Sequence, residues 1–412
     1  MSKPKFSWIG RLILIAIAFR LILAPFYFHP DLKIIYYIAH FLPSGVVNIW
    51  DFLEANPDLN ILGQFVYPPL TYFLFGSFYA LISPLAGPHL DQWLQMGNTA
   101  VEVQYILRYQ LLTKLPLLLI DVSAVFVIYK FFERTKKAKL AAIIWAFNPF
   151  SLYSATLMGQ FDIIPAVLTL VALYLAHKHK KLLYAAILIG LASSLKTYAI
   201  LFLPALVLAN SESWTIKLRI LLIGLASYLL TILPFISSSA FRQSVLFSDL
   251  GQRIFSAGLD FGFNDGIIIA PTLIIFLYLY TWHKKLNQIL LPELFTAITL
   301  ITLSLSHFHP QWFTWAAPFL LILLVRNLKL WPIFALMVIF FVLYILFYDD
   351  LFLNLGLLSP LNPEVYNQSA PSIHFDKIYS SRSIVHLVHS GILATSALII
   401  FSSFKHNPDE TQ

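Results

Sequence analysis

Long runs of apolar residues, separated by short polar breaks, dominate the chain. The runs lie at about 8–27, 67–86, 115–132, 138–158, 162–177, 182–209, 217–237, 267–282, 288–306, 311–325, 330–348 and 384–402. Most approach the length of about 20 residues that a helix needs to cross the hydrocarbon core of a bilayer. The pattern predicts an all-α, polytopic transmembrane protein that forms a single integral membrane domain over residues 1–412.

Basic residues gather in short clusters between these runs. The clusters are YKFFERTKKAK (129–139), HKHKK (177–181), TIKLR (215–219), HKK (283–285) and RNLK (326–329). The positive-inside rule assigns such clusters to the cytoplasm, together with Lys3, Lys5 and Arg11 before a retained first span. Simple alternation of spans from a cytoplasmic N-terminus then puts two of the clusters on the wrong side.

Two adjustments remove this conflict. In the first, residues 67–86 lie along the outer leaflet as an interfacial helix, within a long external loop of about 28–113. In the second, residues 182–209 break near Lys196 into two short spans that meet at the outer face. The predicted topology has about twelve spans, both termini inside, and further external segments at 236–266 and 349–382.

Composition agrees with a membrane protein and excludes several classes of site. Hydrophobic residues make up 59% of the 412 positions and charged residues 11%, more apolar surface than a soluble domain can bury. The absence of cysteine excludes disulfides, zinc–thiolate sites and iron–sulfur clusters. The cytoplasmic clusters account for the net charge of +7, so membrane lipids are the expected partners and nucleic acid is not.

Two cations fall inside the apolar runs. Arg20 lies well into the first run, and Lys196 divides the run at 182–209. A buried cation needs an anion, which in a membrane is either a lipid phosphate or an internal acid such as Asp121 or Glu293. The sequence leaves both partners open.

Polar residues also mark three helix junctions on the predicted outer side. Asp31 follows the first span, and a carboxylate there is either an ordinary loop acid or a general base for a hydroxyl group. The junctions MGQFDIIP (158–165) and LSHFHPQWFTWAAP (305–318) supply polar and aromatic groups suited to sugars, or alternatively capped helix ends. His307 and His309 lack a third ligand in the same turn, so no metal site is predicted.

The order of these motifs resembles the GT-C superfamily of membrane glycosyltransferases. An arginine late in the first span, an acid at its outer end, a helix ending in HFLP and then YPPLTYF resemble the first loop of that superfamily. ILRYQLL, GQFD, SLKTYAILFLP and HFHPQW follow in the same order, so the resemblance covers about residues 8–320. The nearest matches are the dolichyl-phosphate-glucose glucosyltransferases and the bacterial polyprenyl-phosphate-mannose transferases.

The resemblance implies a GT-C-like module over about 8–266, followed by variable spans over 267–412. Its long first external loop would carry two membrane-parallel helices, and a second functional loop would follow span seven. The implied reaction transfers a hexose, mannose or glucose, from a polyprenyl-phosphate sugar to a lipid-linked acceptor, with inversion and without a cofactor. Asp31 would be the general base. Lys196, with Arg20 or Arg253, would bind the donor phosphate, and the residues implied in sugar or acceptor binding are Tyr67, Gln160, Asp162, His309, Gln311 and Trp312.

The chain departs from the glucosyltransferase pattern at two places. Val66 stands where those enzymes carry an acid before YPPL, and Pro310 and Gln311 replace an acid–lysine pair. These differences leave the sugar and the acceptor open. The expected location is the plasma membrane of a prokaryote with an external active site. A lipid-linked sugar flippase or a transporter is the alternative, although such a protein should place its charges nearer the membrane midplane.

Overall fold

The computed structural model describes residues 7–405, except residues 60, 62–64, 98, 134, 249–250, 264 and 369–370. The longer helices are α1 (Trp8–Leu23), α2 (Pro30–Ala39), α4 (Pro69–Ala86), α6 (Ile106–Phe131), α7 (Ala138–Ala146), α9 (Ile163–His179), α10 (Leu182–Ser193), α12 (Trp214–Ile232), α14 (Ile269–His283), α15 (Leu291–Ser304), α16 (Phe313–Arg326), α17 (Trp331–Tyr348) and α19 (Ser381–Lys405). The shorter ones are α3 (Ile49–Ala55), α5 (Leu90–Gln95), α8 (Pro149–Ser151), α11 (Phe202–Leu208), α13 (Ser239–Phe241) and α18 (Pro371–Asp376). In the described chain the only strands, β1 (Gly258–Gly262) and β2 (Asp265–Ile268), form an exposed antiparallel hairpin.

This architecture confirms the predicted all-α, polytopic class. Within the described residues, seven helical stretches are long and apolar enough to cross a membrane: Trp8–Phe26, Pro69–Ala86, Ile106–Phe131, Ala138–Met158, Trp214–Phe235, Leu328–Tyr348 and Ser381–Lys405. Other predicted spans coincide with shorter apolar helices, such as α9, α10 and α14. The length of α4 would also allow it to cross, so its position along the membrane surface, like the count of twelve spans, stays a prediction.

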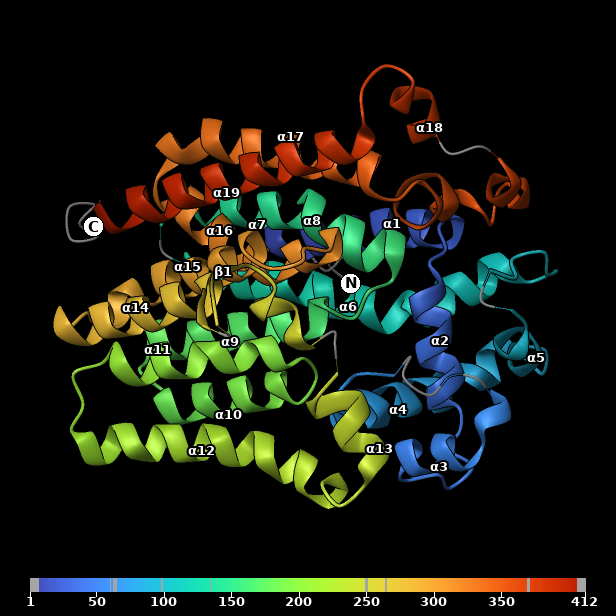
Figure 1. Ribbon diagram of the computed structural model, residues 1–412, viewed down its shortest axis with the longest axis horizontal. Helices are drawn as coiled ribbons and strands as arrows, with labels where there is room; N and C mark the ends of the chain where they lie inside the picture. Colours follow the sequence, from blue (N-terminus) through green and yellow to red (C-terminus); the bar gives the residue numbers. More distant parts are fainter. Residues whose placement is uncertain are drawn as a thin grey trace, which may run out of the picture.

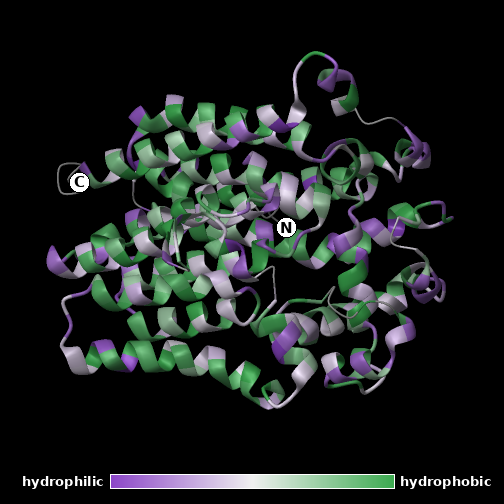
Figure 2. Ribbon diagram, viewed as in Figure 1, coloured by the Kyte–Doolittle hydropathy of each residue, from purple (hydrophilic) through white to green (hydrophobic). Residues whose placement is uncertain are grey.

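The long helices pack in layers around a central group of helices. Figure 1 shows α17 and α19 along one side, α10 and α12 along the opposite side, and α9, α15 and α16 between them. Residues 313–325 of α16 are all buried, as expected for a helix that is apolar on every face. Figure 2 shows hydrophobic residues along most of the outer helices and hydrophilic residues mainly at helix ends and in loops.

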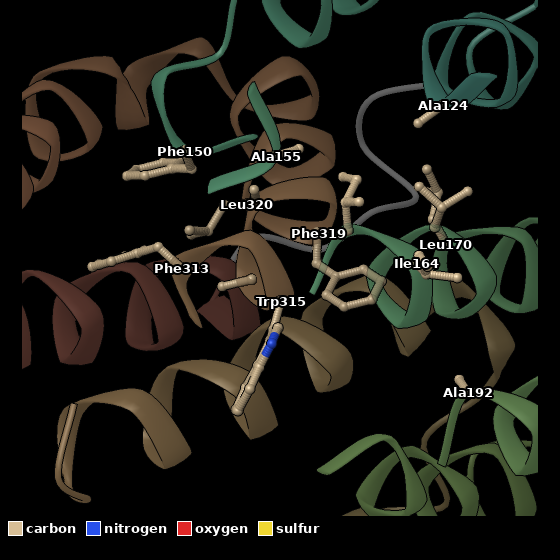
Figure 3. Packing of buried hydrophobic residues seen from close by; sticks show 14 of the residues in the cluster. Ala124, Phe150, Ala155, Ile164, Leu170, Ala192, Phe313, Trp315, Phe319 and Leu320 are labelled. Carbon is tan, nitrogen blue, oxygen red and sulfur yellow. The ribbon is translucent and has the colours of Figure 1, made fainter. Parts of the chain in front are cut away.

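The centre of the bundle is held by interlocking rings and small residues. Figure 3 shows Phe313, Phe319 and Leu320 of α16 projecting from different sides of the helix into the core. Phe150 stacks on Phe313 with ring centroids 4.8 Å apart, and alanines such as Ala155 are fully buried, so the helices approach closely. This packing fixes the end of α16 at which the HPQW turn stands.

The predicted break near Lys196 is confirmed. Helix α10 ends at Ser193, and Lys196 has extended backbone angles of φ −146° and ψ 123° before a 3-10 turn leads into α11. The hydroxyl groups of Ser193 and Ser194 donate hydrogen bonds to the carbonyls of Ile189 and Gly190, one turn back. Such back-bonding weakens and bends helices, which explains a break without proline or glycine.

Helices α2, α3 and α4 pack on residues 232–246. Figure 1 shows α2 running across the direction of α12, α17 and α19. A second apolar cluster joins α3 and α13, where the Trp50 ring contacts the rings of Phe235 and Phe241, and Ser238 hydrogen-bonds Asp51. Helices α2 to α5 all fall within the predicted first loop, and which of them lie parallel to the membrane stays a prediction.

Three of the basic clusters, those of Lys137, His177 and Arg326, meet at one end of the bundle. Lys137 Nζ donates to the Arg326 carbonyl at 2.7 Å, and Arg326 pairs with Glu293 at 2.8 Å and contacts His177. Helices α9 and α16 end in these clusters, whereas their first residues follow the GQFD and HPQW motifs. The basic clusters and the two polar turns therefore lie at opposite ends of the same helices.

Candidate active site

A cavity of about 540 Å³ lies where these polar helix ends converge. Its walls come from the start of α2, the YPP segment, the break after α10, residues 245–248 and 251–254, and the turn before α16. Seven of the ten residues singled out in the sequence line it: Asp31, Tyr67, Lys196, Arg253, His309, Gln311 and Trp312. Residues more than 270 positions apart in the chain thus share one chamber, as the predicted topology required.

Asp31 occupies the first turn of α2 with 39% of its side chain exposed. Because it lines the cavity, that exposure is toward the chamber, with protein on the remaining sides. Gln160 Nε2 donates to Asp31 Oδ2 at 2.9 Å, and the Asp31 backbone N–H donates to His29 Nδ1 at 3.2 Å. The carboxylate is therefore fixed on one side and accessible on the other, as a general base must be.

Opposing influences set the pKa of Asp31. Burial raises this pKa, but His29, the Gln160 hydrogen bond, His309 and Lys196 together outweigh burial and hold it below its ordinary value. Burial also lowers the pKa of His29, and it lowers the pKa of His309 to about 3. Near neutral pH, Asp31 is thus ionised and the two imidazoles are neutral.

The Lys196 ammonium sits in an aromatic cage with one acid. Its Nζ pairs with Asp162 Oδ1 at 2.6 Å. The same nitrogen lies 5.0 Å from the Phe161 ring centroid, 5.5 Å from that of Trp315 and 5.6 Å from that of Tyr67. The side chain remains 11% exposed, so the cation is held in place but reaches the cavity wall.

A column of stacked rings forms another part of the wall. Tyr198 stacks on Trp315 at 3.9 Å and Trp315 stacks on Trp312 at 5.0 Å, with nearly parallel planes. The Arg253 guanidinium lies 5.9 Å from the Trp312 ring centroid. Within the described residues no carboxylate lies within 4 Å of Arg253, so its charge is available to an anion in the cavity.

Gln160 and Asp162 lie behind the wall. Neither lines the cavity, and each contacts a residue that does. Asp162 precedes α9 without capping it through its side chain, and its Oδ1 instead accepts bonds from Lys196 and from Trp315 Nε1, the latter at 2.5 Å. His309 likewise makes no side-chain cap, so the helix-cap alternative does not explain these two residues.

Arg20 is not part of the cavity. Its side chain is fully buried, and Nε donates to Asp121 Oδ2 at 2.7 Å while Nη1 donates to the Ala16 and Ala146 carbonyls. The internal acid that the sequence offered as one of two partners is therefore its partner. A bound phosphate cannot reach this guanidinium without opening the packing of α1, α6 and α7, so Arg20 does not belong to the site.

Three residues of the site were not predicted from the sequence: His29, Tyr198 and Trp315. Trp315 carried a usable signal, because it follows Trp312 by three positions and so shares its helix face. Polar atoms without a partner in the described chain include His309 Nδ1 and Gln311 Oε1, both buried at the wall. Such atoms usually find a ligand or water, and sugar hydroxyl groups would satisfy them.

One part of the chain matches a known family. Residues 65–257 match the model of glycosyltransferase family 87, and this segment contains Tyr67, Gln160, Asp162, Lys196 and Arg253. No curated protein matches the chain. The match supports a membrane glycosyltransferase in general, without distinguishing the donor, the acceptor or the hexose.

Proposed function

We propose that this protein transfers a hexose from a polyprenyl-phosphate sugar to a lipid-linked hydroxyl acceptor, with Asp31 as the general base. The observation that carries the proposal is the shared cavity: one accessible carboxylate and two cations on its wall, within a chain that matches a glycosyltransferase family. The external membrane face and a prokaryotic plasma membrane belong to the same proposal, supported by the basic clusters at the opposite helix ends.

The reaction is a single displacement. The acceptor oxygen attacks the anomeric carbon, and its proton passes to Asp31 as the new glycosidic bond forms. The bond from the anomeric carbon to the phosphate oxygen breaks, and polyprenyl phosphate leaves with the electron pair. One carboxylate suffices because the acceptor attacks from the face opposite the leaving group, which inverts the anomeric carbon.

The charge of the cavity favours a phosphodiester donor. Asp162 already balances Lys196, so the pair adds little net charge, whereas Arg253 has no carboxylate within 4 Å among the described residues and is free to pair with a bound anion. A polyprenyl-phosphate sugar carries one negative charge, which Arg253 can balance while Lys196 contributes hydrogen bonds. These groups would stabilise the charge that develops on the leaving phosphate.

The remaining wall suits the lipid and the sugar. Ile34, Ile200, Leu201, Val245 and Ile254 line the chamber and offer apolar surface to an isoprenoid chain. Tyr67, Trp312, His309 and Gln311 provide rings and hydrogen-bonding groups for a hexose. Mannose and glucose both fit this description, so the identity of the hexose is left to the assay.

The test is a transfer assay with the purified protein in lipid nanodiscs. A panel of polyprenyl-phosphate hexoses is offered with a membrane lipid extract as acceptor. We expect Asp31→Asn to lower kcat by about 10²–10⁴-fold, the usual contribution of a general base, with normal expression and insertion. Asp58→Asn, which changes an exposed acid of the same loop, is the matched control and should keep full activity.

Two results would contradict the proposal. Full activity of Asp31→Asn would remove this carboxylate from the mechanism. No transfer from any donor, together with translocation of a fluorescent lipid-linked sugar across proteoliposomes, would establish the flippase alternative.

A further inference from the structure

The four-residue turn Gly159–Asp162 lies between the two charged groups of the site. Its Gln160 side chain binds the Asp31 carboxylate, and its Asp162 side chain binds the Lys196 ammonium. The Phe161 ring between them lies 5.0 Å from the Lys196 nitrogen and 4.8 Å from the Tyr67 ring. This short segment therefore contacts both the Asp31 carboxylate and the Lys196 ammonium, although none of its residues lines the cavity.

Backbone geometry fixes the direction of this turn. Residues 152–158 form a π-helical turn, which Gly159 ends with the left-handed angles φ 74° and ψ 34°. A Cβ at Gly159 would come within 2.7 Å of Leu32 Cδ2 and 3.0 Å of Lys114 Cε. Because Leu32 adjoins Asp31, the turn packs directly on the helix that carries the proposed base.

The buried Lys114 side chain links the turn to the segment that precedes α2. Lys114 Nζ donates to the carbonyls of Ala24, Tyr27 and Leu157 at 3.1, 2.6 and 2.7 Å. Ala24 and Tyr27 precede Asp31, whereas Leu157 precedes the turn. The ammonium thus links the backbone on the Asp31 side to the backbone on the Gln160 side, and the side chain is fully buried.

We propose that the turn Gly159–Asp162 is a positioning bridge, in which Gln160 orients the Asp31 carboxylate and Asp162 holds Lys196 in its aromatic cage. This inference rests on the proposed function and replaces the expectation from the sequence that Gln160 and Asp162 bind the sugar. Gln160 and Asp162 act through Asp31 and Lys196 and do not contact the sugar. The four residues of the turn thus set the distance between the proposed base, Asp31, and the Lys196 ammonium.

The experiment follows the ionisation of Asp31 itself. Isotope-edited infrared spectra of the full-length protein in nanodiscs are titrated from about pH 2 to 8, and the Asp31 band is the one absent in Asp31→Asn. Gln160→Ala removes a hydrogen bond to the charged form, so the midpoint should rise by about one pH unit. The acidic limb of the kcat/KM profile should move by the same amount.

Two further variants keep the test decisive. Gln110→Ala removes a buried glutamine that does not line the cavity, and it should shift neither the band nor the profile. Gln160→Glu is nearly isosteric and places a second carboxylate beside Asp31, so it should raise the midpoint even if Gln160→Ala does not fold.

The outcomes separate the two proposals. A shifted band in a protein that transfers no sugar would overturn the proposed function and leave the bridge standing. An active protein whose band and kcat/KM profile are unchanged by the substitutions at Gln160 would overturn the bridge alone.

Discussion

Two buried cation–carboxylate pairs in this protein have similar distances and different surroundings. Arg20 and Asp121 meet at 2.7 Å with both side chains fully buried among α1, α6 and α7. Lys196 and Asp162 meet at 2.6 Å, but the ammonium reaches the wall of the cavity and is ringed by Tyr67, Phe161 and Trp315. The distance between the charged atoms does not distinguish the two pairs, whereas access to a ligand does.

The difference concerns what each pair can do. The Arg20–Asp121 pair, here called the sealed pair, is closed to solvent and ligands, so it can contribute only to stability or fold specificity. A pair at a cavity wall can share its cation with an incoming phosphate while the acid stays in place. An intramembrane cation is therefore a functional candidate only after its surroundings are known.

The largest expected effect comes from breaking the sealed pair. Arg20→Met would leave the Asp121 charge buried without a cation and should lower the free energy of unfolding by about 3–5 kcal/mol. Thermal unfolding followed by tryptophan fluorescence would measure the loss. Arg20→Met combined with Asp121→Leu should recover most of it, because Arg20 Nη2 and Asp121 Oδ1 already lack partners in the described chain. A double variant as unstable as the single one would contradict this interpretation.

An intermediate effect is expected at the accessible pair, in binding more than in folding. Lys196→Met should raise the donor KM by about 10–100-fold, the usual value of a charge-assisted hydrogen bond. Stability should fall less than for Arg20→Met, because Trp315 Nε1 still donates to Asp162. Steady-state kinetics over a range of donor concentrations, with Tm measured in parallel, would test both parts. Unchanged donor KM and kcat would remove Lys196 from phosphate binding.

The smallest expected effect is a nearly flat pH dependence around neutrality. The pKa of Asp31 is lowered from its ordinary value of 3.8. Its carboxylate is therefore ionised throughout the neutral range and becomes protonated only when the pH falls through this lowered pKa. His309, with a pKa of about 3, and His29, whose pKa is also lowered, are already neutral and add no step. We expect kcat/KM to stay constant within about twofold between about pH 6.5 and 8. A step near pH 6.5 would indicate that one of these imidazoles titrates at its ordinary value.

Much of the fold followed from the sequence because apolar length and basic clusters constrain a membrane chain strongly. The break at Lys196 was predictable from charge bias alone, and the serines before it give the structural cause. The gathering of Asp31, Lys196 and His309 in one cavity was predictable as well, because the predicted topology puts the helix ends that carry them on one side.

The partners of individual side chains were not predictable in the same way. The sequence offered Arg20 either a phosphate or Asp121, and only the packing of α1 against α6 decides between them. Gln160 and Asp162 were predicted to contact a sugar, since both belong to a polar turn near the site. Their directions depend on Gly159 and on the contact with Leu32, which no pattern of residue types contains.

The shortness of α10 has a consequence for where catalysis would happen. Its 12 residues rise about 18 Å from the basic end, whereas the hydrocarbon core of a bilayer is about 30 Å thick. A helix of this length that starts at the inner boundary of the core ends below the outer boundary, so Lys196 is expected beneath the level of the surrounding lipid headgroups. The phosphate of a lipid donor would have to bind below the level of the headgroups. The rate of the reaction is therefore expected to depend on the thickness of the host bilayer.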